Sequence, residues 1–409
     1  MNVAKVTLFA VLSALVAVGV STTSYAFHSG GVAECGGCHS MHSPAAGGSF
    51  LLVGTDQSSA CLSCHEHAGD TGPSSYHIST ADADMPVGTA PLQRTPGGDF
   101  GWLKKTYTFV VRGTTNVEDG ATHGHNIVAV DKGYAADATN TTAPGGTFPA
   151  ANLACNSCHD PHGKYRRDSA GAVSNTGAPI IASGSYDTSV TPAAGQAVGV
   201  YRLLAGAGYT KSGSTFPGVP AAKTPATYNR TEAATQTRTA YGVASTNGHA
   251  TWGNWCGTCH GDMHSSGNYV HPVDQSLGST IAGIYASYVK SGDMTGTLAS
   301  SFTSLVPFST NSSDYTVLAG LAKNDGSQLG GPVSTDQVNC LSCHRAHATG
   351  FPEMLRWNLE NEFMVKNGIY QTTERGRSTA EAAAGYYDRP VTQFASYQRV
   401  LCNKCHAQD

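Results

Sequence analysis

The longest apolar run of the chain lies at its start, and the apolar residues that follow are scattered among Gly, Ser and Thr. Lys5 precedes the run Val6–Val20, and polar residues then lead to the small-residue sequence "SYA", which ends at Ala26. This order is typical of a secretory signal with its cleavage site. The run is 15 residues long, whereas a bilayer-spanning helix needs about 20 apolar residues. We therefore expect a signal peptide over residues 1–26 and export of the remaining chain.

The pattern beyond the signal predicts few regular elements. Short helices are predicted for three segments, Thr280–Lys290, Pro352–Gly368 and Ser378–Tyr387. The second has the clearest helical period, because Leu355, Leu359 and Phe363 lie largely on one face and a glycine follows as a stop signal. Stretches such as "GAVSNTGAPIIASGS" predict loops. No later segment is long and apolar enough to predict a membrane span.

The composition is that of a loop-rich chain with little aliphatic core. Gly accounts for 48 of 409 residues, and charged residues make up 13% of the chain, against about 25% in typical soluble domains. No composition shift divides the mature chain, so we expect one elongated domain over residues 27–409. The net charge of -4 comes without a basic stripe, which argues against nucleic acid as a partner.

All twelve cysteines belong to CxxCH motifs, the attachment sites of c-type haem. Two thiols three positions apart can each form a thioether to one haem, and the adjacent imidazole then reaches the iron as its proximal ligand. The six motifs are Cys35-Cys38-His39, Cys61-Cys64-His65, Cys155-Cys158-His159, Cys256-Cys259-His260, Cys340-Cys343-His344 and Cys402-Cys405-His406.

Two other interpretations of these cysteines compete with haem attachment. Exported proteins often carry disulfides, and CxxC pairs can hold structural zinc. Neither requires a histidine directly after the second cysteine in all six motifs. We therefore predict six covalently bound haem c groups, which supply much of the apolar interior. The predicted fold class is a multihaem c-type cytochrome, predominantly coil with a few short helices and little sheet.

The motifs are unevenly placed along the chain. Their starts lie 26, 94, 101, 84 and 62 residues apart, which argues against a regular solenoid repeat. A basic run, "KYRR" at residues 164–167, has two open interpretations. It could pair with haem propionates, or it could form a solvated charged surface.

Seventeen histidines leave eleven beyond the six proximal ones, enough for a second imidazole on every iron. His42, His162 and His347 stand three residues after a proximal histidine, and His264 stands four after. On a helical turn such positions are neighbours, so one imidazole can take its own haem and the next a different one. A surface or supporting role is the alternative for each of them.

The other histidines are ranked by their surroundings. His125 in "GHNIVA", His271 in "VHPVD" and His77 in "SSYHIST" sit in apolar or turn contexts that could bury a ligand. His28, beside the cleavage site, and His264 are held in reserve as distal ligands. His67 faces away from its motif, and His123 and His249 are expected to be solvated. Two methionines beside histidines, Met41 and Met263, are expected to fill gaps rather than bind iron.

These features favour an electron-transfer protein over an enzyme. An iron with two histidine ligands cycles between two oxidation states without an open position for substrate. A multihaem reductase needs one iron with an exchangeable site, and the surplus of histidines argues against that. A monomeric periplasmic carrier is the other alternative, and it requires all six distal ligands to come from one chain.

Long stretches of the chain resemble a known family. They include "FHSGGVAECGGCHSMHS", "GPSSYHISTADADMP", "TPGGDFGWLKKTY", "CNSCHDPHGKYRR", "TIAGIYASYVKSGDMTGT", "NCLSCHRAHATGF" and "YQRVLCNKCHAQD". The chain thereby resembles the OmcS-type hexahaem outer-surface cytochromes of metal-reducing bacteria, whose subunits polymerise into conductive filaments. The matches run in order over nearly the whole mature chain.

The resemblance carries implications for ligation and assembly. It implies bis-histidine ligation, a continuous haem stack and a filament of identical subunits on the outer surface, with the periplasm as the alternative location. It also implies that His42 binds a haem of the adjoining subunit, the fifth one, whose proximal ligand is His344. Expected partners are further subunits, other multihaem cytochromes, and extracellular metal oxides or electrodes.

Overall fold

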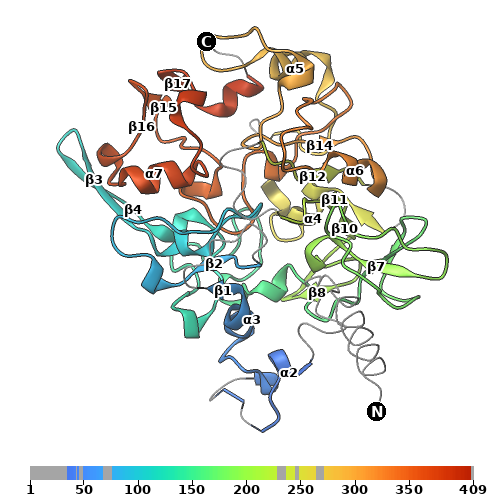
Figure 1. The fold of residues 1–409 in the computed structure, drawn as a ribbon. Coiled ribbons are helices and arrows are strands. Elements are labelled where there is room, and N and C mark those ends of the chain that lie inside the picture. Colours follow the sequence, from blue (N-terminus) through green and yellow to red (C-terminus); the bar gives the residue numbers. More distant parts are fainter. Residues whose placement is uncertain are drawn as a thin grey trace, which may run out of the picture.

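The computed structural model describes residues 35–42, 44–45, 49–67, 76–227, 236–244, 248–263 and 271–406. Most of this chain is irregular, with short helices and strands distributed through it (Figure 1). The first described residues, 35–52, form an extension at the lower end of the view that we call the N-terminal projection. The rest of the chain forms the body. The predicted signal peptide, His28 and His264 lie outside the described residues.

The helices are short. They are α2 (Cys35–Cys38), α3 (Gln57–His65), α4 (Trp252–Gly257), α5 (Gly278–Ser287), α6 (Tyr315–Leu321) and α7 (Thr379–Gly385). Two of the three predicted helices are present as α5 and α7, with ends shifted by one to three residues. Ser378 starts α7 with a capping box, because its side chain and that of Glu381 bond each other's backbone N–H. Within the described residues, no helix is long and apolar enough to cross a membrane.

The helix predicted over residues 352–368 is wrong. Its first turn is a 3-10 turn in which Glu353 and Met354 have φ angles of 54° and 58°, values that an α-helix does not permit. Its last part is β15 (Phe363–Lys366), the centre of a three-stranded sheet. Pairing with distant strands and with a haem motif outweighs the helical period of this segment, which is a weak local preference.

The strands form small separate sheets. They are β1 (Glu66–His67), β2 (Ser79–Thr80), β3 (Tyr107–Val111), β4 (Thr114–Glu118), β5 (Arg166–Asp168), β6 (Val173–Ser174), β7 (Ala197–Gly199), β8 (Thr210–Lys211), β9 (Ser214–Thr215), β10 (Val219–Pro220), β11 (Ala222–Lys223), β12 (Ala240–Gly242), β13 (His249–Ala250), β14 (Ser309–Thr310), β15, β16 (Ile369–Tyr370) and β17 (Tyr397–Arg399). The longest pair, β3 with β4, is an antiparallel hairpin. No described sheet exceeds three strands, so sheets do not organise this fold.

The body contains two aromatic clusters, and cysteines of the motifs lie beside both. One cluster gathers Trp252 and Trp255 around the third and fourth motifs. The other gathers Phe351 and Trp357 around the fifth and sixth motifs. These clusters place the haem attachment sites against rigid apolar surfaces, in agreement with a fold organised around haem.

The residues of the "KYRR" run differ in exposure. Lys164 is exposed, whereas Arg167 is buried and its guanidinium lies 4.0 Å from the ring centre of Tyr315. The run is therefore not a solvated face over its full length.

Candidate haem-binding sites

Each CxxCH motif forms one helical turn. In five of them the histidine N–H donates to the carbonyl of the first cysteine, four residues earlier, at 2.8–3.1 Å, and the other motif forms the end of α3. Residues at positions i, i+3 and i+4 share one face of such a turn. The two thiols and the imidazole of a motif therefore face the same side, as attachment of one haem requires.

The cysteines are free, and the motifs adjoin one another in chain order. All twelve cysteines are described, and none forms a disulfide. Where the second motif meets the third, the Cys61 thiol hydrogen-bonds to Cys155, which raises the pKa of Cys61. Where the fourth meets the fifth, the Cys256 thiol hydrogen-bonds to Cys340 and its pKa is raised in the same way. First cysteines thus meet at both of these junctions.

The other neighbouring motifs influence each other over a longer range. Here burial raises the pKa of a second cysteine, and the charge of a thiol in the next motif raises it further. These pairs are Cys38 with Cys64, Cys158 with Cys259, and Cys343 with Cys402 and Cys405. The six attachment sites therefore form one line in sequence order, in which two kinds of junction alternate.

The first, third and fifth motifs share one backbone clamp. The proximal Nδ1–H donates to the carbonyl of Phe50, Arg202 or Glu353, at 2.9, 2.7 and 2.7 Å. Each of these acceptors has a positive φ, as does the residue after it, and a leucine then bridges back to the proximal histidine. The bridges are His39 with Leu52, His159 with Leu204, and His344 with Leu355.

Carbonyls also hold two proximal histidines of the other motifs. His65 Nδ1 donates to the carbonyl of Tyr76 at 2.8 Å, and His260 Nδ1 donates to the carbonyl of Pro144 at 2.8 Å. A histidine whose Nδ1–H is bound to a carbonyl presents Nε2 as the ligand atom. In five motifs the proximal ring is thus held in the tautomer that binds iron.

Three pairs of histidine rings stand at the separation that two ligands of one iron require. The ring centres are 6.4 Å apart for His159 with His347, 6.0 Å for His125 with His260, and 6.3 Å for His271 with His406. An imidazole–metal bond is about 2 Å long, and a ring centre lies roughly 1 Å behind its nitrogen. Two rings on opposite sides of one metal are therefore about 6 Å apart. These residues fit bis-histidine haem.

Two of these imidazoles are held neutral. Burial, with a smaller contribution from His159, lowers the pKa of His347 to about 3. Burial, with a smaller contribution from His260, lowers the pKa of His125 to about 4. Since a metal binds the unprotonated ring, both side chains are ready to bind iron at neutral pH.

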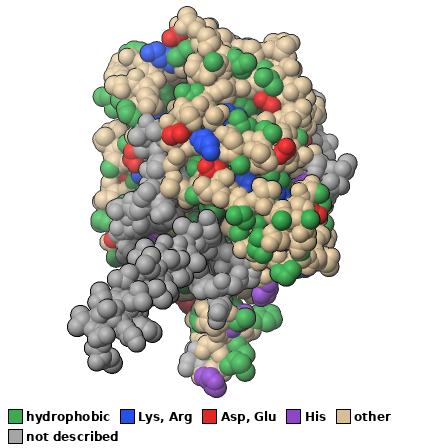
Figure 2. All heavy atoms as spheres, turned by 45° about the vertical axis from the view of Figure 1, so that its right-hand side comes forward, with side chains coloured by type: hydrophobic (Ala, Val, Ile, Leu, Met, Phe, Trp, Pro, Cys, Tyr) green, Lys and Arg blue, Asp and Glu red, His purple; other side chains and the backbone are tan. Residues whose placement is uncertain are grey.

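The N-terminal projection presents His42 to the outside. His42 is exposed, and two apolar neighbours in the projection, Met41 and Phe50, are 79% and 75% exposed. Figure 2 shows histidine and hydrophobic side chains together on the part of the molecule that extends below the body. Among the described residues, neither His344 nor His39 has a second histidine ring at the separation found for the three pairs.

Two other predicted distal ligands have different surroundings. His162 is exposed. His77 is buried, and its ring centre lies 4.6 Å from that of Tyr76. Neither arrangement tests the role in iron binding, which stays a prediction for both.

Two histidines predicted to be solvated are not. His123 is fully buried, with Nδ1 3.1 Å from the carbonyl of Trp102 and Nε2 2.6 Å from Glu118. His249 is half-buried, with its ring nitrogens 3.2 and 3.0 Å from the carbonyls of Val219 and Gly171. The Gly- and Thr-rich sequence around them suggested solvent, but contacts with distant segments enclose both rings.

The prediction that Met41 and Met263 fill gaps is also wrong. Met41 is 79% exposed and Met263 is 49% exposed. Both side chains follow a haem motif closely, and the surface position of these segments keeps them out of the apolar clusters.

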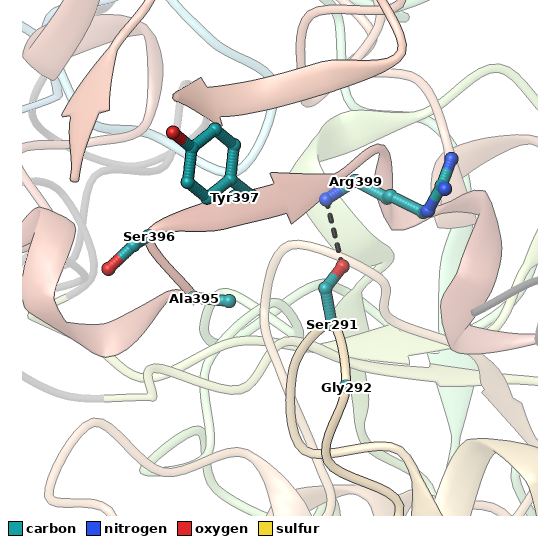
Figure 3. A pocket seen from close by; sticks show the side chains of 6 residues that line it. All are labelled: Ser291, Gly292, Ala395, Ser396, Tyr397 and Arg399. Carbon is teal, nitrogen blue, oxygen red and sulfur yellow. Dashed lines mark hydrogen bonds between the residues drawn. The ribbon is translucent and has the colours of Figure 1, made fainter. Parts of the chain in front are cut away.

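A surface hollow near the sixth motif contains none of the predicted ligands. It has a volume of about 490 Å³ and lies between residues 291–292 and 395–399 (Figure 3). The Arg399 N–H donates to Ser291 Oγ at 2.8 Å along its wall.

The sequence-based reading missed an alternation that the structure makes plain. Only the first, third and fifth motifs continue as CxxCHxxH, and only these have the leucine clamp. The clamp segments, "SFLLVG", "YRLLAG" and "PEMLRW", share a leucine at the same place. Pairing the motifs two by two reveals this repeat, because the second histidine and the leucine segment mark every other motif.

The chain is similar to known proteins in sequence and in structure. The chain is 56% identical to "C-type cytochrome OmcS" of Geobacter sulfurreducens, over 94% of this chain and 95% of that protein. Two solved structures of OmcS, titled as nanowires and as a filament, match with TM-scores of 0.87 and 0.86 at 55% identity, covering 94% of this chain and all of theirs. No protein-family model matches the chain.

Proposed function

The chain belongs to the OmcS family of c-type cytochromes, and on this premise we propose that it transfers electrons outside the cell along a filament of identical subunits. The solved relatives are described as nanowires and as an outer-membrane cytochrome filament. The chain is thus an electron-transfer protein rather than an enzyme. The alternatives of a monomeric periplasmic carrier and of a reductase are less favoured.

The cofactor is covalently bound haem c, and we propose six of them. The twelve motif cysteines supply two thioether bonds for each group, and His39, His65, His159, His260, His344 and His406 are the proximal ligands. Bound haem supplies the Fe(II)/Fe(III) couple. The carbonyl bonds to five proximal Nδ1 atoms fix the ring orientation and make these imidazoles stronger donors.

The assignment of distal histidines to irons is based on one pair of rings. His347 follows the fifth motif, yet its ring faces His159 of the third motif. The second histidine of CxxCHxxH therefore serves the iron two motifs earlier. By the same rule, we assign His162 after the third motif to the iron of the first, whose proximal ligand is His39, although these two rings do not form a close pair in the single chain.

For the first motif, this rule assigns the second histidine, His42, to an iron of another subunit. Among the three CxxCHxxH motifs of this chain, this rule assigns no histidine to the iron of His344 and no iron of the same chain to His42. We assign His42 to the fifth iron of the adjoining subunit. The exposure of His42 on the N-terminal projection supports this assignment. Such a contact between unlike surfaces produces a filament where its rotation does not close into a ring, and the solved relatives are filaments.

A second rule covers the remaining irons. His125 and His271 each precede an odd-numbered motif and face the proximal histidine of the next even-numbered one, His260 and His406. The corresponding position before the first motif is His28, which we assign to the iron of His65. His77, predicted as a distal ligand from its own surroundings, is the alternative for this iron, and His264 stays in reserve.

The order of attachment sites supports a single electron path. Thiols of adjoining motifs lie near enough to raise one another's pKa from the first motif to the sixth, which supports cofactors arranged in sequence order. We propose that electrons enter from other multihaem cytochromes and leave to extracellular metal oxides or electrodes. The protein reaches the outer surface after cleavage of the predicted signal peptide at residue 26.

Electron cryo-microscopy of the secreted protein, beside a His42→Ala variant, tests this function. We expect filaments of the wild type with Nε2 of His42 on the neighbouring subunit's fifth iron, and no filaments of the variant. A wild-type monomer with all six irons bound by its own histidines would instead identify a soluble carrier. Carbon monoxide uptake by the reduced wild type would identify an open iron and favour a reductase.

A further inference from the structure

Two distal ligands of different irons are joined through their backbones. The N–H of His125 donates to the carbonyl of His347 at 2.9 Å, and Nδ1 of His125 donates to the carbonyl of Ala346 at 2.7 Å. In the proposed ligand set, His125 belongs to the fourth iron and His347 to the third. One contact between two segments therefore positions ligands on both irons.

A third segment completes this arrangement. The N–H of His347 donates to the carbonyl of Gly97 at 2.7 Å. Ala348 forms backbone bridges with Gly98 on one side and Gly124 on the other. We call these three segments, residues 97–98, 123–125 and 345–349, the ligand brace. The third segment follows the other two by more than 200 residues in the chain, so only the tertiary fold brings the three together.

Glycines permit the close approach of the three segments. A Cβ on Gly124 would lie 2.3 Å from the carbonyl oxygen of His347, and one on Gly98, whose φ is 92°, would lie 1.8 Å from the carbonyl oxygen of Ala348. A Cβ on Gly97 would meet the imidazole of His347 itself, at 2.8–3.1 Å. Any larger residue at these positions must displace the backbone or the ring of a ligand.

Buried charges anchor the middle segment. His123 is fully buried between the Trp102 carbonyl and the Glu118 carboxylate, and its own carbonyl accepts the N–H of Thr349 at 3.0 Å. Arg377 pairs with the same carboxylate and donates to the carbonyl of Gly350 at 3.1 Å. The two longer segments of the brace are thus bound to one ion cluster, which limits their movement.

We propose that the ligand brace sets the positions of the distal ligands of the third and fourth irons through one shared backbone contact. Gly97, Gly98 and Gly124 are its positioning residues. This inference rests on the proposed ligand set, and its test uses polymerised protein, in which the fifth iron is bound by His42 of the neighbouring subunit. His125 and His347 lie on two segments that are bonded to each other. The distance between the two irons that they bind therefore depends on this contact and not on the loops around it.

Single glycine substitutions in the full-length, haem-loaded protein distinguish the shared contact from two separate ones. Gly124→Ala separates the segments, so about two of the six irons are expected to become high-spin and to bind carbon monoxide after reduction. Gly97→Ala displaces only the His347 ring, so about one of the six is expected to change. Electron paramagnetic resonance and carbon monoxide titration count these irons. Gly320→Ala, whose Cβ would have no neighbour within 4 Å, is the control and keeps all irons low-spin.

The outcomes separate the brace from the proposed function. If Gly124→Ala alters one iron or none, the shared contact is refuted while the ligand set stands. If the wild type already contains high-spin iron that binds carbon monoxide, the ligand set itself fails. Should Gly124→Ala not mature, amide hydrogen exchange of the wild type decides. Slow exchange of the His125 and Thr349 amides supports the brace, and fast exchange of either overturns it.

Discussion

The N-terminal projection and the body use the same motif in different ways. Both contain CxxCHxxH with a leucine clamp, and the clamp bonds agree within 0.2 Å between Phe50 and Glu353 as acceptors. In the body, His347 is enclosed against His159 and stacks on Phe100 at 4.7 Å. In the projection, His42 is exposed. Local sequence thus builds the same turn twice, and the surroundings decide which iron the second histidine reaches.

The largest expected effect comes from removing His42 and His347 in separate variants. His42→Ala is expected to abolish filaments, because the bond between subunits is lost, whereas His347→Ala should leave filaments and open one iron to carbon monoxide. Sedimentation and negative-stain microscopy measure the first effect, and difference spectra measure the second. His249→Gln serves as a matched control, since both of its ring nitrogens face carbonyls. If the His42→Ala variant still forms filaments, His42 does not join the subunits, and the proposed difference between the projection and the body is contradicted.

The second largest effect is expected from the buried ion cluster of Glu118, His123 and Arg377. This cluster holds the segment with His347 in the body, and the described part of the projection has no such cluster. Glu118→Gln leaves Arg377 and His123 without a buried carboxylate. Removing one partner of a buried pair costs about 3–5 kcal/mol, so we expect a clear fall in thermal midpoint and in resistance to denaturant.

An exposed ion pair provides the control for the cluster. Asp82→Asn removes the partner of Lys104, which it contacts at 2.6 Å with 72% of its own side chain exposed. Exposed pairs contribute about 1 kcal/mol or less. Equal destabilisation by Glu118→Gln and Asp82→Asn would show that the cluster does not anchor the body.

A smaller effect is expected from the apolar surface of the projection. Phe50 is 75% exposed in the single chain, and docking of a second subunit would bury it. Phe50→Ser should raise the concentration needed for polymerisation about tenfold, since burying such a ring contributes about 1.5–3 kcal/mol. Light scattering against concentration measures this. Val87→Ser, fully exposed on the body, should not change it, and an equal effect of both would refute a specific role of the projection.

The smallest effect is a pH dependence confined to the body. Burial, followed by the nearby Arg167, lowers the pKa of Lys223 to about 7, whereas an unfolded lysine has a pKa of about 10.4. Between these values the unfolded chain binds the extra proton, so stability rises with pH from about 7 to about 10. We expect the thermal midpoint to rise by a few degrees over this range. Lys223→Met should flatten the rise, and an unchanged slope would contradict the assignment.

The covalent chemistry of the molecule could be predicted from the sequence, because it depends on residues within five positions of each other. Each CxxCH closes on itself through one backbone bond, so the site forms wherever the motif occurs. The helix α7 was predictable for a similar reason, since its capping box spans Ser378 to Glu381. Distant contacts defeated the local pattern elsewhere. The segment 352–368 became a left-handed turn and a strand because His344 and β17 bind it.

The sequence by itself predicted six haem attachment sites, the histidine that follows each of them, and export of the chain. The tertiary structure alone decided which second histidine faces which motif histidine. His347 reaches His159 across 188 positions of the chain, and His125 reaches His260 across 135. Ligation of that kind depends on where separate segments meet in space. The physical reason is that a thioether needs only its own turn, whereas a distal ligand needs a fold, or a second subunit, to deliver it.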